Sequence, residues 1–132
     1  MPEPKVSLVT GAGRGIGRDI AQRMAREGYA VGLIARTKSQ LEETAELIRQ
    51  KGGKALVTPT DVSKREQVLA SVEAVERELG PIAVLINNAA NDQREAVDEV
   101  SEEDWDRAIA LNLKHQFFAA QIARRSMRER LG

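Results

Sequence analysis

The sequence has 132 residues, the length of one ordinary domain with a sizeable core. Twenty basic and twenty acidic residues give a net charge of zero, which suggests neither nucleic acid nor an anionic membrane as a partner. The absence of cysteine excludes disulfides and thiolate metal sites, and one histidine leaves little for a zinc site. The sequence contains no signal-peptide core and no run of transmembrane length, so we expect a soluble, cytoplasmic protein without a metal.

A glycine-rich stretch near the N-terminus combines a strand, a turn and the start of a helix. Residues 6–10 are a short, mainly apolar run with a β-branched bias, which predicts a buried strand, and apolar residues recur at helical spacing from Ile16. Such a turn directs backbone N–H groups and the positive end of the helix dipole at a pyrophosphate, and its glycines allow close approach. The turn is therefore predicted to bind a dinucleotide; the alternative is a strand–helix turn without a ligand.

Helices and strands alternate along the next part of the chain. The first helix should end near Gly28, and residues 30–35 form a buried second strand. Ser39 and Glu42 have the spacing of a capping box, which predicts the start of a second helix there. The buried stripe of this helix consists of Leu41, Ala45 and Ile48.

The third and fourth strands complete the expected sheet. Residues 55–58 form a strand that Pro59 restricts to a sheet edge, because proline cannot donate to a ladder. A second capping box, Ser63 with Glu66, should open a helix with the stripe Val68, Val72, Val75 and Leu79. Residues 82–86 are an unbroken apolar strand. We expect a three-layer α/β domain over residues 1–132, a Rossmann-like parallel sheet in the order 3-2-1-4 with helices on both faces.

A long helix is predicted from Ser101, after a polar loop, to about residue 128. It is apolar over much of its circumference, so one sheet face cannot cover it. We expect its uncovered side to include Leu111, Phe117, Phe118 and Ile122. These side chains and the edge at residues 82–86 predict a homo-oligomer, most simply a dimer through the helix, the strand edge or both.

Three motifs in order carry a family resemblance. The pattern Thr10-Gly11-x-x-x-Gly15-Ile16-Gly17 resembles the short-chain dehydrogenase/reductase family. Asn87-Asn88-Ala89-Ala90 is similar to the family's Asn-Asn-Ala-Gly, and Leu111-Asn112-Leu113 matches its asparagine on the long helix. The resemblance implies that Asn112 is catalytic and holds a water in a proton relay; the alternative is a structural amide. It also implies the cofactor-binding residues Gly11, Gly13, Arg14, Gly15, Ile16, Gly17, Arg36, Asp61, Val62, Asn88 and Ala89.

Two arginines indicate which dinucleotide binds. An Asp or Glu at the end of the second strand is the usual partner of the NAD ribose 2′-OH, but Ala35 and Arg36 stand there. The guanidinium groups of Arg14 and Arg36 suit a 2′-phosphate. The resemblance therefore implies NADP in preference to NAD, unless both arginines are only surface residues.

Other positions are given roles by the resemblance. Asp61 and Val62 would contact the adenine amino group and ring, unless Asp61 is only a loop residue. Asn88 would pin the sheet, and Ala90 departs from the family glycine, which adds a methyl group near the nicotinamide ribose. His115 lies one turn beyond Asn112 and off its face, so its position, rather than the resemblance, leads us to expect it at the surface or an interface and not as a ligand.

The family's Tyr-x-x-x-Lys segment has no counterpart in this sequence. The tyrosine is the general acid or base, and the only tyrosine here is Tyr29, with Leu33 four residues on. We therefore expect the N-terminal, NADP(H)-binding half of a short-chain dehydrogenase/reductase, unable to catalyse hydride transfer between NADPH and a carbonyl or alcohol by itself. The alternative is a non-catalytic oligomeric protein that keeps the fold for assembly.

Overall fold

The computed structural model describes residues 4–90 and 96–131, so part of the loop expected after the fourth strand lies outside the described residues. Its centre is a parallel four-stranded sheet in the order β3-β2-β1-β4, as predicted. The strands are β1 (Val6–Thr10), β2 (Ala30–Ala35), β3 (Ala55–Pro59) and β4 (Ile82–Ile86). The strand β3, which ends in Pro59, lies at one edge, and β4 lies at the other.

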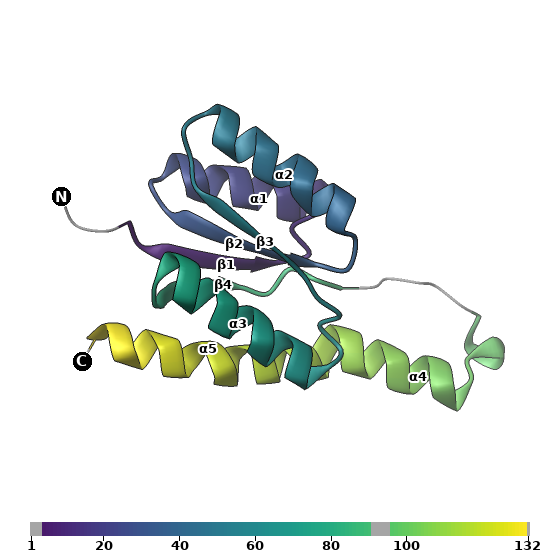
Figure 1. The fold of residues 1–132 in the computed structure, drawn as a ribbon. Helices are drawn as coiled ribbons and strands as arrows, with labels where there is room; N and C mark the ends of the chain where they lie inside the picture. Colours follow the sequence, from purple (N-terminus) through teal and green to yellow (C-terminus); the bar gives the residue numbers. More distant parts are fainter. Residues whose placement is uncertain (1–3, 91–95, 132) are drawn as a thin grey trace.

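Helices cover both faces of the sheet, which confirms the predicted three layers (Figure 1). The helices α1 (Gly15–Arg26) and α2 (Lys38–Gln50) lie on one face; α3 (Arg65–Leu79) and α5 (His115–Leu131) lie on the other. Alternate residues of a strand point to opposite faces. Accordingly, Val6 and Leu8 pack with α3 and α5, while Val9 packs with α1 and α2. Among the described residues, no helix has the length and apolarity needed to cross a membrane.

Both capping boxes predicted for α2 and α3 are wrong. The residue before α2 is Thr37, so Ser39 already lies inside the first turn and its hydroxyl cannot cap the helix. Before α3, the Ser63 hydroxyl donates instead to the Asp61 carboxylate, at 2.6 Å. Short polar side chains readily form such local bonds, which compete with helix capping. A capping box does open α4 (Glu102–Ile109), where Ser101 pairs with Asp104.

The long helix consists of α4, a π-helical segment η2 (Ala110–Lys114) and α5, which form one rod in Figure 1. The expected exposure of Ile122 is wrong, because its side chain is 2% exposed and packs into the core beside α3. Leu111 and Phe118 are half-buried, and the Arg65 guanidinium lies 5.5 Å from the Phe118 ring centre. A π-helical turn contains an extra residue, which rotates the faces of the helix beyond it. Phe117 is exposed as expected, and the other exposed apolar side chains in the described part of this helix are Trp105, Ile109 and Leu113.

His115 is buried, which corrects the expectation of a surface or interface position. Its side chain is 2% exposed, and its Nδ1 atom is hydrogen-bonded to the Leu111 carbonyl. Burial penalises the charged ring and lowers the pKa of His115 below its ordinary value, against the opposing effect of that hydrogen bond. The neutral imidazole is therefore a buried group at the start of α5.

We expect the fold to lose stability as the pH falls through the ordinary histidine pKa of 6.5, because of His115. The unfolded chain protonates at a higher pH than the folded chain, so the free energy of unfolding rises with pH across this range. One group contributes at most about 1.4 kcal/mol per pH unit. Thermal unfolding at a series of pH values should show this slope, and His115→Gln should remove it. A slope that survives the substitution would contradict the assignment, since the chain has no other histidine.

Candidate functional site

A groove of about 770 Å³ lies at the carboxyl ends of the strands, a volume suited to a small-molecule ligand. Its walls come from the glycine-rich loop after β1, from the segments after β2, β3 and β4, and from α4 and η2 of the long helix. The predicted cofactor residues that line it are Gly11, Gly13, Arg14, Gly15, Ile16, Gly17, Arg36, Asp61, Asn88 and Ala89. The topology thus brings five separate sequence segments together.

Two predicted residues do not line this groove. Val62 is buried and packs into the core cluster that contains Val68 and Val72. Asn112 lies in the π-helical segment η2 and is half-buried. Six further lining residues were not predicted from the sequence, namely Thr37, Gln40, Thr60, Ser63, Arg107 and Leu111.

The glycine-rich loop runs from the end of β1 into α1, and its backbone comes very close to itself. A Cβ atom on Gly17 would lie 1.9 Å from the Gly11 carbonyl oxygen. The loop is also tied to the sheet, since the Ala12 N–H donates to the Ile34 carbonyl at 3.2 Å. The absence of a side chain at Gly17 is therefore required for the loop to fold back against the helix.

Thr10 and Asn88 join the ends of β1 and β4. The Thr10 hydroxyl oxygen accepts hydrogen bonds from the Asn88 and Ala89 N–H groups, each at 3.0 Å. The Asn88 side-chain amide in turn donates to the Gly11 carbonyl at 3.3 Å. Thr10 belongs to the glycine pattern, but the pattern does not predict it as a site residue. These bonds hold the loop and the segment after β4 in a fixed relation.

Asp61 forms a negatively charged corner of the groove. It accepts hydrogen bonds from the Ser63 hydroxyl at 2.6 Å and the Ser63 N–H at 3.0 Å. The Ser63 side-chain bond in particular lowers the pKa of Asp61, and the positive charges of Arg36 and Lys64 act in the same direction, while partial burial opposes them. Asp61 is thus an ionised acceptor near neutral pH.

The guanidinium groups of Arg14 and Arg36 are exposed at the rim of the groove. Within residues 4–90 and 96–131, neither forms a salt bridge of 4.0 Å or less. Ala35 at the end of β2 supplies no carboxylate for a ribose hydroxyl. The two arginines can therefore both turn to an anionic group.

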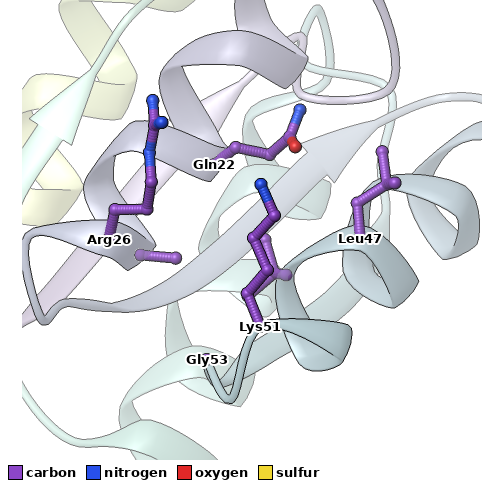
Figure 2. Close-up of a pocket in the computed structure, with 7 residues that line it drawn as sticks. Gln22, Arg26, Leu47, Lys51 and Gly53 are labelled. Atoms are coloured by element: carbon purple, nitrogen blue, oxygen red, sulfur yellow. The ribbon is translucent and has the colours of Figure 1, made fainter.

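A second hollow lies between α1 and α2, away from this groove (Figure 2). Gln22 and Arg26 lie on one side of it, and Leu47 and Lys51 on the other. Its volume of about 30 Å³ holds little more than a water molecule or two. Over the part of the chain that the structure describes, no three histidine or acidic side chains gather in a way that could hold a metal ion. The large groove is the candidate site.

Comparison with known proteins identifies what this arrangement resembles. Residues 5–132 match the family described as short chain dehydrogenase. Gluconate 5-dehydrogenase from Gluconobacter oxydans is 39% identical over 121 residues, which are 92% of this chain and 47% of that protein. The chain spans about half the length of the curated relatives it matches.

Solved structures have the same fold. L-sorbose reductase from Gluconobacter frateurii, in complex with NADPH and L-sorbose, matches with a TM-score of 0.91 at 33% identity, over 97% of this chain and 49% of that one. A variant of actinorhodin polyketide ketoreductase with NADPH matches with a TM-score of 0.91 at 35% identity, over 96% of this chain and 49% of that one.

Proposed function

Because this chain belongs to the short-chain dehydrogenase family, we propose that it forms the NADP(H)-binding half of an oxidoreductase. The proposed parent reaction is hydride transfer between NADPH and a carbonyl or alcohol. The observation that carries the proposal is the groove, in which the glycine-rich loop, Arg14 and Arg36 meet the segment after β4. Two relatives of the same fold, each in a structure with NADPH, support this choice of cofactor.

The glycine-rich loop would hold the pyrophosphate. The helix α1 begins at Gly15, and the first N–H groups of a helix have no partner within it. Together with the helix dipole, they attract an anion. Because Gly17 packs closely against Gly11, the loop backbone lies against the start of α1. This position would leave space for the phosphates above the loop.

Arg14 and Arg36 would bind the 2′-phosphate that distinguishes NADPH from NADH. Arg36 follows β2 and Arg14 lies in the glycine-rich loop, so the two side chains approach the rim from different segments. A guanidinium can donate two parallel hydrogen bonds to one phosphate.

The remaining residues would hold the adenosine and the nicotinamide ribose. The Asp61 carboxylate would accept a hydrogen bond from the adenine amino group, and Val62 would support the ring from the core beneath. Asn88 and Ala89 would border the nicotinamide ribose, beside the methyl group of Ala90. NADPH supplies the hydride when it is bound, and these residues would orient it.

Asn112 would hold a water for the proton relay. The general acid of that relay is a tyrosine, and Tyr29 does not supply it because it precedes β2, whose amino end lies away from the groove. We therefore propose that these 132 residues bind the cofactor but do not perform the family reaction by themselves.

Calorimetric titration should show tighter binding of NADPH than of NADH. Arg36→Ala should weaken NADPH binding about 10- to 100-fold. This loss corresponds to the contribution of about 1.5–3 kcal/mol that hydrogen bonds to a charged group make to binding. The same substitution should leave NADH binding nearly unchanged, because NADH has a hydroxyl where NADPH has the phosphate.

Arg26→Ala is the matched control, since Arg26 is an exposed arginine of α1 beside the small hollow rather than the groove. It should change neither affinity by more than about twofold. Equal affinities of the unmodified chain for NADPH and NADH would contradict the NADP preference. Unchanged NADPH binding by Arg36→Ala would remove Arg36 from the site.

A second candidate function is a non-catalytic oligomeric protein that keeps the fold for assembly. The apolar side chains exposed along the long helix favour it, and Ala90 places a methyl group where the family has glycine. A chain that binds neither NADPH nor NADH at millimolar concentration, but forms a stable oligomer, would favour this function over the first.

A further inference from the structure

Arg18 follows Gly17 on α1, and its side chain joins the glycine-rich loop to α2. Its Nη2 atom donates to the Gly13 carbonyl at 2.6 Å and to the Gln40 carbonyl at 3.2 Å. Its Nε atom donates to the Thr44 hydroxyl at 3.0 Å. The same guanidinium contacts the Glu43 carboxylate at 3.0 Å, and the side chain is 24% exposed. Arg18 is thus held between the loop and α2.

Thr44 completes this connection from α2. It is fully buried, and its hydroxyl donates to the Ala12 carbonyl at 2.9 Å. The loop also packs directly on α2, since a Cβ atom on Gly13 would lie 3.0 Å from the Cβ atom of Gln40. We call the Arg18 and Thr44 side chains, with the Ala12 and Gly13 carbonyls that they bind, the loop latch.

The loop latch fixes the direction of two successive loop carbonyls. The Gly13 oxygen is bound by Arg18 of α1 and the Ala12 oxygen by Thr44 of α2, and neither of these side chains lines the groove. A loop carbonyl that is free to turn its negative end towards a bound anion would repel it, and these bonds remove that freedom. A loop already held in its binding conformation also loses less entropy when a ligand binds.

We propose that Arg18 and Thr44 are positioning residues that hold the glycine-rich loop ready for a pyrophosphate. The inference rests on the proposed function, because it assigns the loop to the pyrophosphate of the cofactor. It adds two residues to the binding machinery: Arg18, on the helix that the loop enters, and Thr44, on the helix after β2. Neither residue lines the groove, so each acts through the loop.

The test compares ligands with and without a pyrophosphate. NADPH and NADH contain one, whereas adenosine 2′-monophosphate has only the adenosine and the 2′-phosphate. Binding of all three to the 132-residue chain is measured by NMR titration. Arg18→Met should weaken NADPH and NADH about tenfold each and change binding of the monophosphate less than threefold. A role in folding alone would weaken all three ligands equally, in proportion to the unfolded fraction.

Paired variants at Thr44 isolate the hydroxyl. Thr44→Val keeps the shape but removes the bond to Ala12, and should reproduce the selective loss; Thr44→Ser keeps the hydroxyl and should restore binding to within about threefold. Arg23→Met is the matched control, because Arg23 is an exposed arginine of α1 that pairs with Glu27 at the surface. It should leave all three affinities unchanged. If Arg18→Met does not fold, the Thr44 pair decides the question.

Equal losses for all three ligands, or no loss for NADPH and NADH, would overturn the loop latch. Failure of the proposed function gives a different result, in which the unmodified chain binds none of the three ligands. Binding of NADPH by the unmodified chain together with an unselective Arg18→Met would keep the function and remove the latch.

Discussion

Gly17→Ala is expected to unfold the chain or destabilise it by about 3 kcal/mol or more, the upper part of the range for overpacked sites. An added Cβ atom would lie 1.9 Å from the Gly11 oxygen and 2.7 Å from the Gly11 carbonyl carbon. Both are backbone atoms, so no side-chain rotation can relieve the overlap. Helix propensity alone predicts the opposite sign, since alanine in a helix is about 1 kcal/mol more favourable than glycine. Urea unfolding without any cofactor measures the difference.

Gly15→Ala is the matched control for this experiment. Gly15 begins the same helix, and a Cβ atom there would meet no atom within 4 Å. Its φ of +56° is strained for alanine, so a cost of about 1–2 kcal/mol is expected from conformation alone. If Gly17→Ala were as stable as the unmodified chain, the close approach of the loop to α1 would be wrong.

The strand order and the layers could be predicted because hydrophobic period and turn chemistry agree along this chain. The β4 run at residues 82–86 is apolar throughout, as a strand covered on both faces must be. Pro59 placed β3 at an edge, where the structure has it. The helix starts were less predictable. Ser39 lies inside the first turn of α2 instead of before it, and the Ser63 hydroxyl bonds to Asp61 instead of capping α3. Such choices between local partners depend on the whole fold.

The positions in the groove could be predicted where one short motif contains them. The glycine pattern and the residues after β4 lie in continuous segments, and each segment ends at the same edge of the sheet. Contacts between segments could not be predicted in this way. Arg18 and Thr44 are 26 residues apart, and nothing in the helical spacing of α2 distinguishes Thr44 from an ordinary buried residue. The π-helical turn η2 likewise changes which side chains are covered, without a glycine or proline to indicate it.

We expect the 132-residue chain to form a two-fold dimer through α4 and the adjoining turns of the long helix. Trp105 and Leu113 are each 62% exposed and Phe117 is 64% exposed, at intervals of four or eight residues. Each large apolar side chain left in water forgoes about 1.5–3 kcal/mol of hydrophobic stabilisation. The typical free energy of unfolding of a domain is only about 5–15 kcal/mol. A two-fold contact would cover the same side chains on both copies at once.

Phe117→Glu should therefore raise the dissociation constant of the dimer at least about 100-fold, because it places two carboxylates in one apolar contact. Light scattering after size-exclusion chromatography would detect a monomer at micromolar concentration. Phe117 is a better position for this substitution than Phe118. The Phe118 ring is half-buried and packs against Arg65, so a charge at Phe118 would also disturb the fold. Lys64→Glu reverses the charge of an exposed side chain and should leave the dimer intact. A stable monomer of the unmodified chain would contradict the dimer, and a dimer that survives Phe117→Glu would exclude the helix contact in favour of the β4 edge.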